Sequence, residues 1–141
     1  MPILFDSSLY IRALRDDDAA LLVQRWARET PLWLSVVVLE ELYAGAARND
    51  WRILEKLERD FERAKRILVP GLGDWSVAGR MLAGVAEKYG FERIGRARLT
   101  NDALIAASAG RAGITVLTAN GRDFAKLAEF CPVQWETRAV P

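Results

Sequence analysis

An alanine-rich segment between Thr100 and Gly110 places the strongest constraint on the fold of this chain. The segment opens with the polar residues Thr100, Asn101 and Asp102 and continues with small apolar residues. Small side chains let a helix lie close against a sheet, and Thr100 is a residue type that caps helix N-termini. We therefore predict a buried helix that begins at Thr100, with Asp102 in its first turn. An aspartate in that turn can simply cap the helix, so whether Asp102 has a functional role depends on where the other acids of the chain lie.

Strand-like and helix-like stretches alternate along the whole sequence. Short apolar or β-branched runs predict strands, and apolar residues at helical spacing predict the helices between them. We predict strands at residues 2–5, 32–34, 114–118 and 133–135, and helices at residues 9–14, 16–26, 35–45, 51–68, 74–89, 100–112 and 123–130. This alternation is typical of the α/β class with a parallel sheet.

The length of 141 residues suits a single domain, residues 1–141, with a substantial core. No uninterrupted apolar run approaches the roughly 18 residues that cross a bilayer, so we expect no membrane segment. Asp6 and Arg12 interrupt the N-terminal stretch, which argues against a signal peptide and favours a cytoplasmic protein. The single cysteine, Cys131, cannot form an internal disulfide.

The chain contains no histidine, which excludes many common catalytic systems. Imidazole bases, Ser-His-Asp triads and the usual zinc sites depend on that residue. Any chemistry must therefore use carboxylates, hydroxyls and arginines. The 20 basic and 19 acidic residues give a net charge of +1, which by itself does not indicate a polyanionic partner.

Three acids, Asp6, Asp102 and Asp123, fall where a predicted strand ends or a helix begins, and Glu41 rather than Glu40 lies on the apolar face of the predicted 35–45 helix. Ligands of open α/β sheets bind outside the carboxyl ends of the strands, so we expect these acids to gather at one rim. Crowded carboxylates raise each other's pKa, and a hard divalent cation such as Mg²⁺ or Mn²⁺ relieves the repulsion. Such a site suits phosphoryl chemistry, although each aspartate could also be a simple helix cap.

The predicted loop at residues 90–99 carries three arginines, Arg93, Arg96 and Arg98, shortly before Asp102. They could be solvated loop residues. Their place beside an acid makes Arg96 and Arg98 candidates for contacts with substrate phosphates.

Four segments in order resemble the PIN domain as used by VapC-type toxins of bacterial and archaeal toxin–antitoxin pairs. They are residues 3–8, 41–45, 101–107 and 117–124. The resemblance implies a three-layer α/β/α sandwich with a central parallel sheet and an endoribonuclease activity that depends on Mg²⁺ or Mn²⁺. Asp6, Glu41 and Asp102 match the acid positions of the family, which implies that they bind the metal and act in catalysis.

The fourth acidic position departs from the family pattern. Many PIN domains have an acid two residues after the strand-ending threonine, here Thr118, but this chain has Asn120. Asp123 is a candidate replacement, and Asn120 can offer an oxygen to a metal or a donor to a phosphate. Thr118 is a candidate for orienting water or a carboxylate near the substrate.

The resemblance also implies partners: RNA as the substrate, a cognate antitoxin whose tail lies across the helices, and a second copy in a homodimer. Five tryptophans in a chain with 51% hydrophobic residues are compatible with apolar surface left for partners, although the core could absorb them.

Two other classes of protein stay open. One is a catalytically inactive PIN fold that binds RNA or protein, which Asn120 suggests. The other is an aspartate phosphoacceptor domain, which would need a further acid or Thr within a residue or two of the first aspartate and a Lys on a late strand end. Here Asp6 is followed by Ser7 and Ser8, and no Lys lies near Thr118.

Overall fold

The computed structural model describes residues 1–15, 30–90, 97–119 and 121–137. Of the predicted elements, the helix at 16–26 lies outside these residues, as do Arg96 and Asn120. None of the helices in the described part of the chain is long and apolar enough to cross a membrane.

Five parallel strands form the central sheet in the order β3-β2-β1-β4-β5. The strands are β1 (Ile3–Phe5), β2 (Leu32–Ser35), β3 (Ile67–Leu68), β4 (Thr115–Thr118) and β5 (Trp135–Thr137). Strand β1 lies at the centre, where Leu4 pairs with Trp33 on one side and with Val116 on the other. The predicted α/β sandwich with a central parallel sheet is therefore confirmed.

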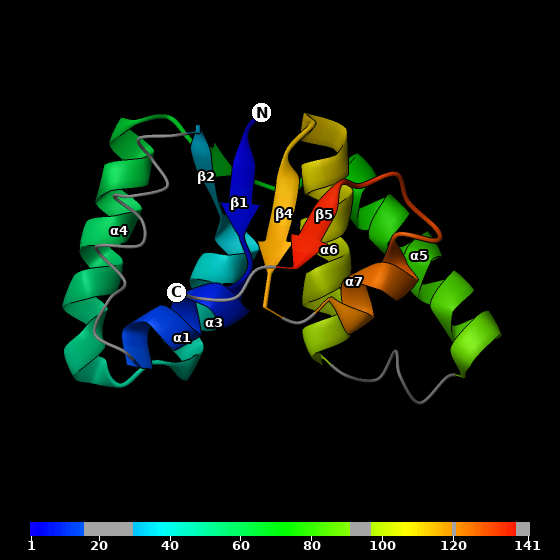
Figure 1. The fold of residues 1–141 in the computed structure, drawn as a ribbon, viewed down its shortest axis with the longest axis horizontal. Helices are drawn as coiled ribbons and strands as arrows, with labels where there is room; N and C mark the ends of the chain where they lie inside the picture. The colour runs from blue at the N-terminus through cyan, green and yellow to red at the C-terminus, as the bar shows by residue number, and fades with distance from the viewer. Residues whose placement is uncertain (16–29, 91–96, 120, 138–141) are drawn as a thin grey trace.

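Helices connect successive strands and cover the sheet (Figure 1). They are α1 (Ser7–Arg15), α3 (Val36–Gly45), α4 (Trp51–Arg63), α5 (Leu72–Tyr89), α6 (Ala97–Ala112) and α7 (Arg122–Leu127), with a short 3-10 turn η1 (Arg48–Asp50) before α4. Figure 1 shows α4 at one end of the molecule beside β2, and α5 at the other end beside α6.

The alanine-rich helix α6 forms the buried layer next to β4. Its residues from Ala103 to Ala109 are all buried, and Ala103, Ala106 and Ala109 have no exposed surface. At the end of the helix, a Cβ atom added to Gly110 would lie 2.4 Å from the carbonyl oxygen of Pro132. Small residues are therefore required because α6 approaches its neighbours so closely.

Two predicted boundaries are wrong. Helix α6 begins at Ala97, so Thr100 is not its N-cap and Asp102 does not lie in its first turn. The helix predicted for residues 51–68 ends at Arg63, because Lys65 has a positive φ of 58° and residues Ile67–Leu68 form β3 instead. The short strand is held by its pairing with Leu34 and Ser35 of β2, which no local pattern reveals.

The other predicted elements that fall within the described residues are confirmed with small shifts. Ser35 caps α3 as predicted, since its hydroxyl oxygen accepts a hydrogen bond from the Val37 amide at 3.2 Å. Gly113, with φ of 70°, follows the end of α6. The last strand lies at Trp135–Thr137 rather than at residues 133–135. Helix α5 begins at Leu72, so Asp74 belongs to its first turn and accepts a hydrogen bond from the Gly71 amide at 2.8 Å.

Candidate functional site

The carboxyl ends of β1, β2 and β4 lie side by side at one edge of the sheet, and α1 and α3 begin there (Figure 1). Asp6 follows β1 directly, and its amide donates a hydrogen bond to the carbonyl oxygen of Leu117 in β4 at 3.0 Å. Ser35 ends β2, and Thr118 ends β4. The topology therefore brings together side chains from three separate parts of the sequence at the place where parallel sheets bind ligands.

Asp6 is buried, with 5% of its surface exposed, and hydroxyl groups hold both of its carboxylate oxygens. The Ser8 hydroxyl donates to Oδ1 and the Thr118 hydroxyl donates to Oδ2, each at 2.5 Å, and the Ser8 amide also donates to Oδ1 at 3.1 Å. Burial raises the pKa of Asp6 more than these hydrogen bonds lower it. The hydrogen bonds therefore hold the Asp6 carboxylate in place, but they do not fully stabilise its negative charge.

Glu41 lies on the inner side of α3, whereas Glu40 is exposed. Burial raises the pKa of Glu41, and the negative charge of Asp6 raises it further. The side chains of Asn101 and Ser7 lie near enough to lower this pKa in part, but among the described residues Oε1 has no well-formed hydrogen bond although it is buried. Glu41 and Asp6 therefore interact electrostatically. Their hydrogen bonds do not fully offset the rise in pKa that burial causes.

The other predicted site residues differ in burial and in the element that carries them. Asp102 is buried with 6% of its surface exposed, one residue after Asn101, on a helix that contacts α3. Asp123 is partly exposed in the first turn of α7, the helix that follows β4. Arg98 belongs to helix α6 and not to the predicted loop. Arg96 and Asn120 lie outside the described residues.

A divalent cation such as Mg²⁺ needs oxygen ligands that lie close together. Within residues 1–15, 30–90, 97–119 and 121–137, no three acidic, cysteine or histidine side chains come together as a ready metal cluster. Mg²⁺, however, usually keeps several waters and binds through one or two carboxylates. The oxygen-only pair of Asp6 and Glu41, with the unpartnered Oε1 of Glu41, suits such a cation.

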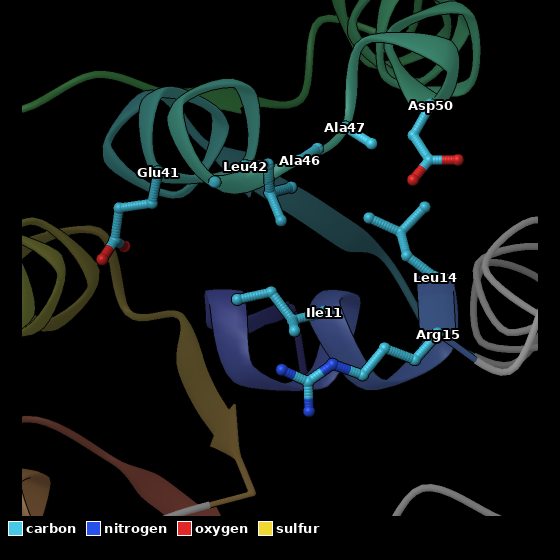
Figure 2. Close-up of a pocket in the computed structure, with 9 residues that line it drawn as sticks. Ile11, Leu14, Arg15, Glu41, Leu42, Ala46, Ala47 and Asp50 are labelled. Atoms are coloured by element: carbon cyan, nitrogen blue, oxygen red, sulfur yellow. The ribbon is translucent and has the colours of Figure 1, made fainter.

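A groove of about 260 Å³ lies between α1 and α3 and has Glu41 in its wall. Figure 2 shows Glu41 at one end and Asp50 at the other, with Ile11 and Leu14 of α1 facing Leu42 of α3. The remaining lining residues are Arg15, Gly45, Ala46 and Ala47. A ligand in this groove would therefore touch an aliphatic floor and also reach one of the clustered acids.

The bridging role of Ser8 could not be predicted from the sequence. Besides donating to Asp6, its hydroxyl oxygen accepts a hydrogen bond from the Ala119 amide at 3.0 Å. A serine two residues after an acid is a common signal for a local turn. The contact with Ala119 joins residues 111 positions apart and has no local signal.

Comparisons with known proteins agree with this architecture. The family model described as "PIN domain" matches residues 3–130. Among solved structures, DNA-bound VapBC from Salmonella typhimurium is similar, with 19% identity, a TM-score of 0.68 and coverage of 97% of this chain and 98% of that chain. VapBC2 from Rickettsia felis bound to a promoter DNA fragment has 19% identity, a TM-score of 0.66 and coverage of 99% and 100%. VapBC-5 from Mycobacterium tuberculosis has 23% identity, a TM-score of 0.60 and coverage of 97% and 98%. No curated protein matches the chain.

Proposed function

We propose, from the premise that this chain belongs to the PIN domain family, that it is a metal-dependent endoribonuclease and the toxin of a toxin–antitoxin pair. One observation carries the proposal: Asp6 and Glu41 are drawn together at the carboxyl edge of the sheet with raised pKa values. Two crowded acids without a compensating charge lower the stability of a fold, and a bound divalent cation offsets that cost.

Asp6, Glu41 and Asp102 would hold Mg²⁺ or Mn²⁺, since all three offer oxygen ligands. A bound cation supplies a water of lowered pKa and neutralises charge on the phosphate. In the reaction, the oxygen of water adds to phosphorus, one P–O bond of the RNA backbone breaks, and the departing oxygen takes up a proton. The contribution of this chain is to orient the carboxylates, and the Thr118 hydroxyl does so for Asp6.

Substrate contacts form the next part of the proposal. Arg96 and Arg98 would bind RNA phosphates as bidentate donors. Asn120 would donate to a phosphate or complete the metal site, and Asp123 would serve as the fourth acid of the site from the start of α7. Thr118 would act through Asp6, because its hydroxyl donates to that carboxylate.

A cognate antitoxin and a second copy of the chain are the proposed protein partners. The similar structures from Salmonella typhimurium and Rickettsia felis are VapBC complexes bound to DNA, which supports an antitoxin partner. The groove between α1 and α3 would accept an apolar antitoxin segment, since Ile11, Leu14 and Leu42 line it. Association in a homodimer would be measured by sedimentation, with and without the antitoxin.

The decisive experiment is cleavage of labelled RNA by the purified protein with Mg²⁺ or Mn²⁺ and with a chelator. We expect cleavage only with the metal, and Asp6→Asn and Asp102→Asn should lower the rate by more than about 100-fold, beyond the 10–100-fold typical of residues that only support metal ligands. Asp74→Asn is the matched control, because Asp74 is equally buried but pairs with Arg111.

Unchanged cleavage by both Asp6→Asn and Asp102→Asn would contradict the proposal. RNA binding without cleavage under all metal conditions would instead indicate a catalytically inactive PIN fold.

A further inference from the structure

We propose that Ser8 is a positioning residue of the acidic site: its hydroxyl fixes the Asp6 carboxylate against the end of β4, in the orientation in which it would hold the cation. The inference rests on the proposed function for the identity of the cation. The contacts that support it are independent of that function.

Ser8 connects three structural elements through one hydroxyl group. A serine hydroxyl has a single proton to donate and can also accept. The proton goes to Asp6 Oδ1 at 2.5 Å, and the oxygen accepts from the Ala119 amide at 3.0 Å, directly after β4. The end of β1, the start of α1 and the end of β4 are therefore held in one arrangement by Ser8.

The two carboxylate oxygens of Asp6 differ in the hydrogen bonds that they accept. An ionised carboxylate offers about two acceptor positions on each oxygen. Oδ1 receives both the amide and the hydroxyl of Ser8, whereas Oδ2 receives the Thr118 hydroxyl. The Leu9 amide also lies near enough to the carboxylate to lower its pKa. Hydroxyl groups therefore hold both oxygens of Asp6, and together they keep the carboxylate from rotating.

A purely structural explanation would make Asp6 an N-cap of α1 and nothing more. The cap needs the bond from the Ser8 amide to Oδ1 and neither of the hydroxyl bonds. Removing the Ser8 hydroxyl would then affect stability at most, while the folded protein would bind metal as before. The two explanations therefore differ in metal affinity and not in folding.

The test compares Mn²⁺ binding by calorimetry in the full chain and in three variants. Ser8→Ala should bind Mn²⁺ about 10–100-fold more weakly, as residues that support metal ligands do. Ser8→Thr keeps the hydroxyl and should restore most of the affinity. Ser108→Ala is the matched control, because it removes another serine hydroxyl that donates a hydrogen bond, here to Leu104 O at 2.7 Å within α6. Its Mn²⁺ affinity should equal that of the unaltered chain.

A second measurement separates this inference from the proposed function. Three-bond couplings in the metal-free protein report χ1 of Asp6, which should occupy one rotamer in the unaltered chain and several in Ser8→Ala. If the unaltered chain neither binds Mn²⁺ nor cleaves RNA, the proposed function fails, and the couplings still test the positioning role. A single Asp6 rotamer in Ser8→Ala, or unweakened Mn²⁺ binding, would overturn the inference. Ser8→Cys, which keeps the size but donates weakly, replaces Ser8→Ala if that variant does not fold.

Discussion

Two buried aspartates of this protein have opposite electrostatic surroundings. Asp6 and Asp74 expose 5% and 2% of their surface. Burial raises the pKa of Asp6, whereas hydrogen bonds from Arg111 hold the pKa of Asp74 below its usual value. Burial alone therefore does not decide the charge state of an acid in this fold, and the presence of a cationic side chain does.

The contacts of Asp74 show what a compensated acid looks like. The Arg111 Nε donates to both carboxylate oxygens at 3.0 Å, and its Nη2 lies 2.9 Å from Oδ2. Oδ2 also accepts from the Gly71 amide, so the pair joins the start of α5 to the end of α6. No arginine or lysine forms such a pair with Asp6 or Glu41 in the described part of the chain. Asp74 thus has its cation within the protein, whereas under the proposed function Asp6 and Glu41 take theirs from solution.

Added metal should affect the two kinds of acid differently, and this is the largest effect that we expect. Mn²⁺ at about 100 times its dissociation constant should raise the free energy of unfolding by about 2.7 kcal/mol, because it binds the folded state alone. Asp74→Asn should show the same gain, and Asp6→Asn should show little. Urea denaturation with and without Mn²⁺ measures both. An equal gain in Asp6→Asn would place the metal elsewhere.

The Arg111 pair gives the next largest effect. Arg111→Met leaves the Asp74 carboxylate without its cationic partner and with the Gly71 amide as a remaining hydrogen-bond donor, so we expect a clear loss of unfolding free energy. Asp74→Asn should cost less, because the Arg111 side chain is 54% exposed and remains hydrated.

Arg80→Met, a change at an exposed arginine of α5, is the control for this pair. Urea denaturation of the three variants provides the comparison. A loss in Arg111→Met no larger than in Arg80→Met would show that the buried carboxylate does not depend on its guanidinium.

Many features at the carboxyl edge of the sheet could be predicted from the sequence, because each follows from a local sequence pattern. A short apolar run followed by Asp6 indicated a strand end and a helix start, and the Ser35 cap followed from one residue type at one position. The distribution of apolar residues around α3 correctly favoured Glu41 over Glu40 as the inward acid. The resemblance to the PIN domain, read from four such segments, is confirmed by the family match.

The remaining features depend on contacts between distant residues. Ile67 and Leu68 continue a helical pattern in sequence but form a strand because β2 is available to pair with them. Thr100 is a good cap by residue type, yet α6 extends three residues before it. The link from Ser8 to Ala119 exists only after β1 and β4 pair. Local propensity cannot specify such features, since tertiary contacts override it.

The pH dependence of the metal-free protein gives the smallest but most direct contrast between the two kinds of acid. A raised pKa in the folded state means that the folded protein binds more protons than the unfolded chain between the two pKa values, so stability falls as pH rises through that window. For Asp6 and Glu41, stability should therefore increase when the pH is lowered from neutral toward their ordinary values of 3.8 and 4.5. Asp74 has the opposite sign, and its contribution is lost only as the pH falls below 3.8 through its lowered pKa.

Glu41→Gln isolates one part of this profile. The neutral amide removes a partly buried charge and also its repulsion with Asp6, so at neutral pH the metal-free variant should be more stable by roughly 0.5 kcal/mol, a size usual for sites that keep contact with solvent. The gain should shrink as the pH is lowered, because Glu41 itself becomes neutral there, and thermal unfolding at several pH values measures it. Glu40→Gln is the control at the neighbouring exposed position. A lower stability of Glu41→Gln at neutral pH would mean that the Glu41 charge is already compensated, and the contrast with Asp74 would then fail.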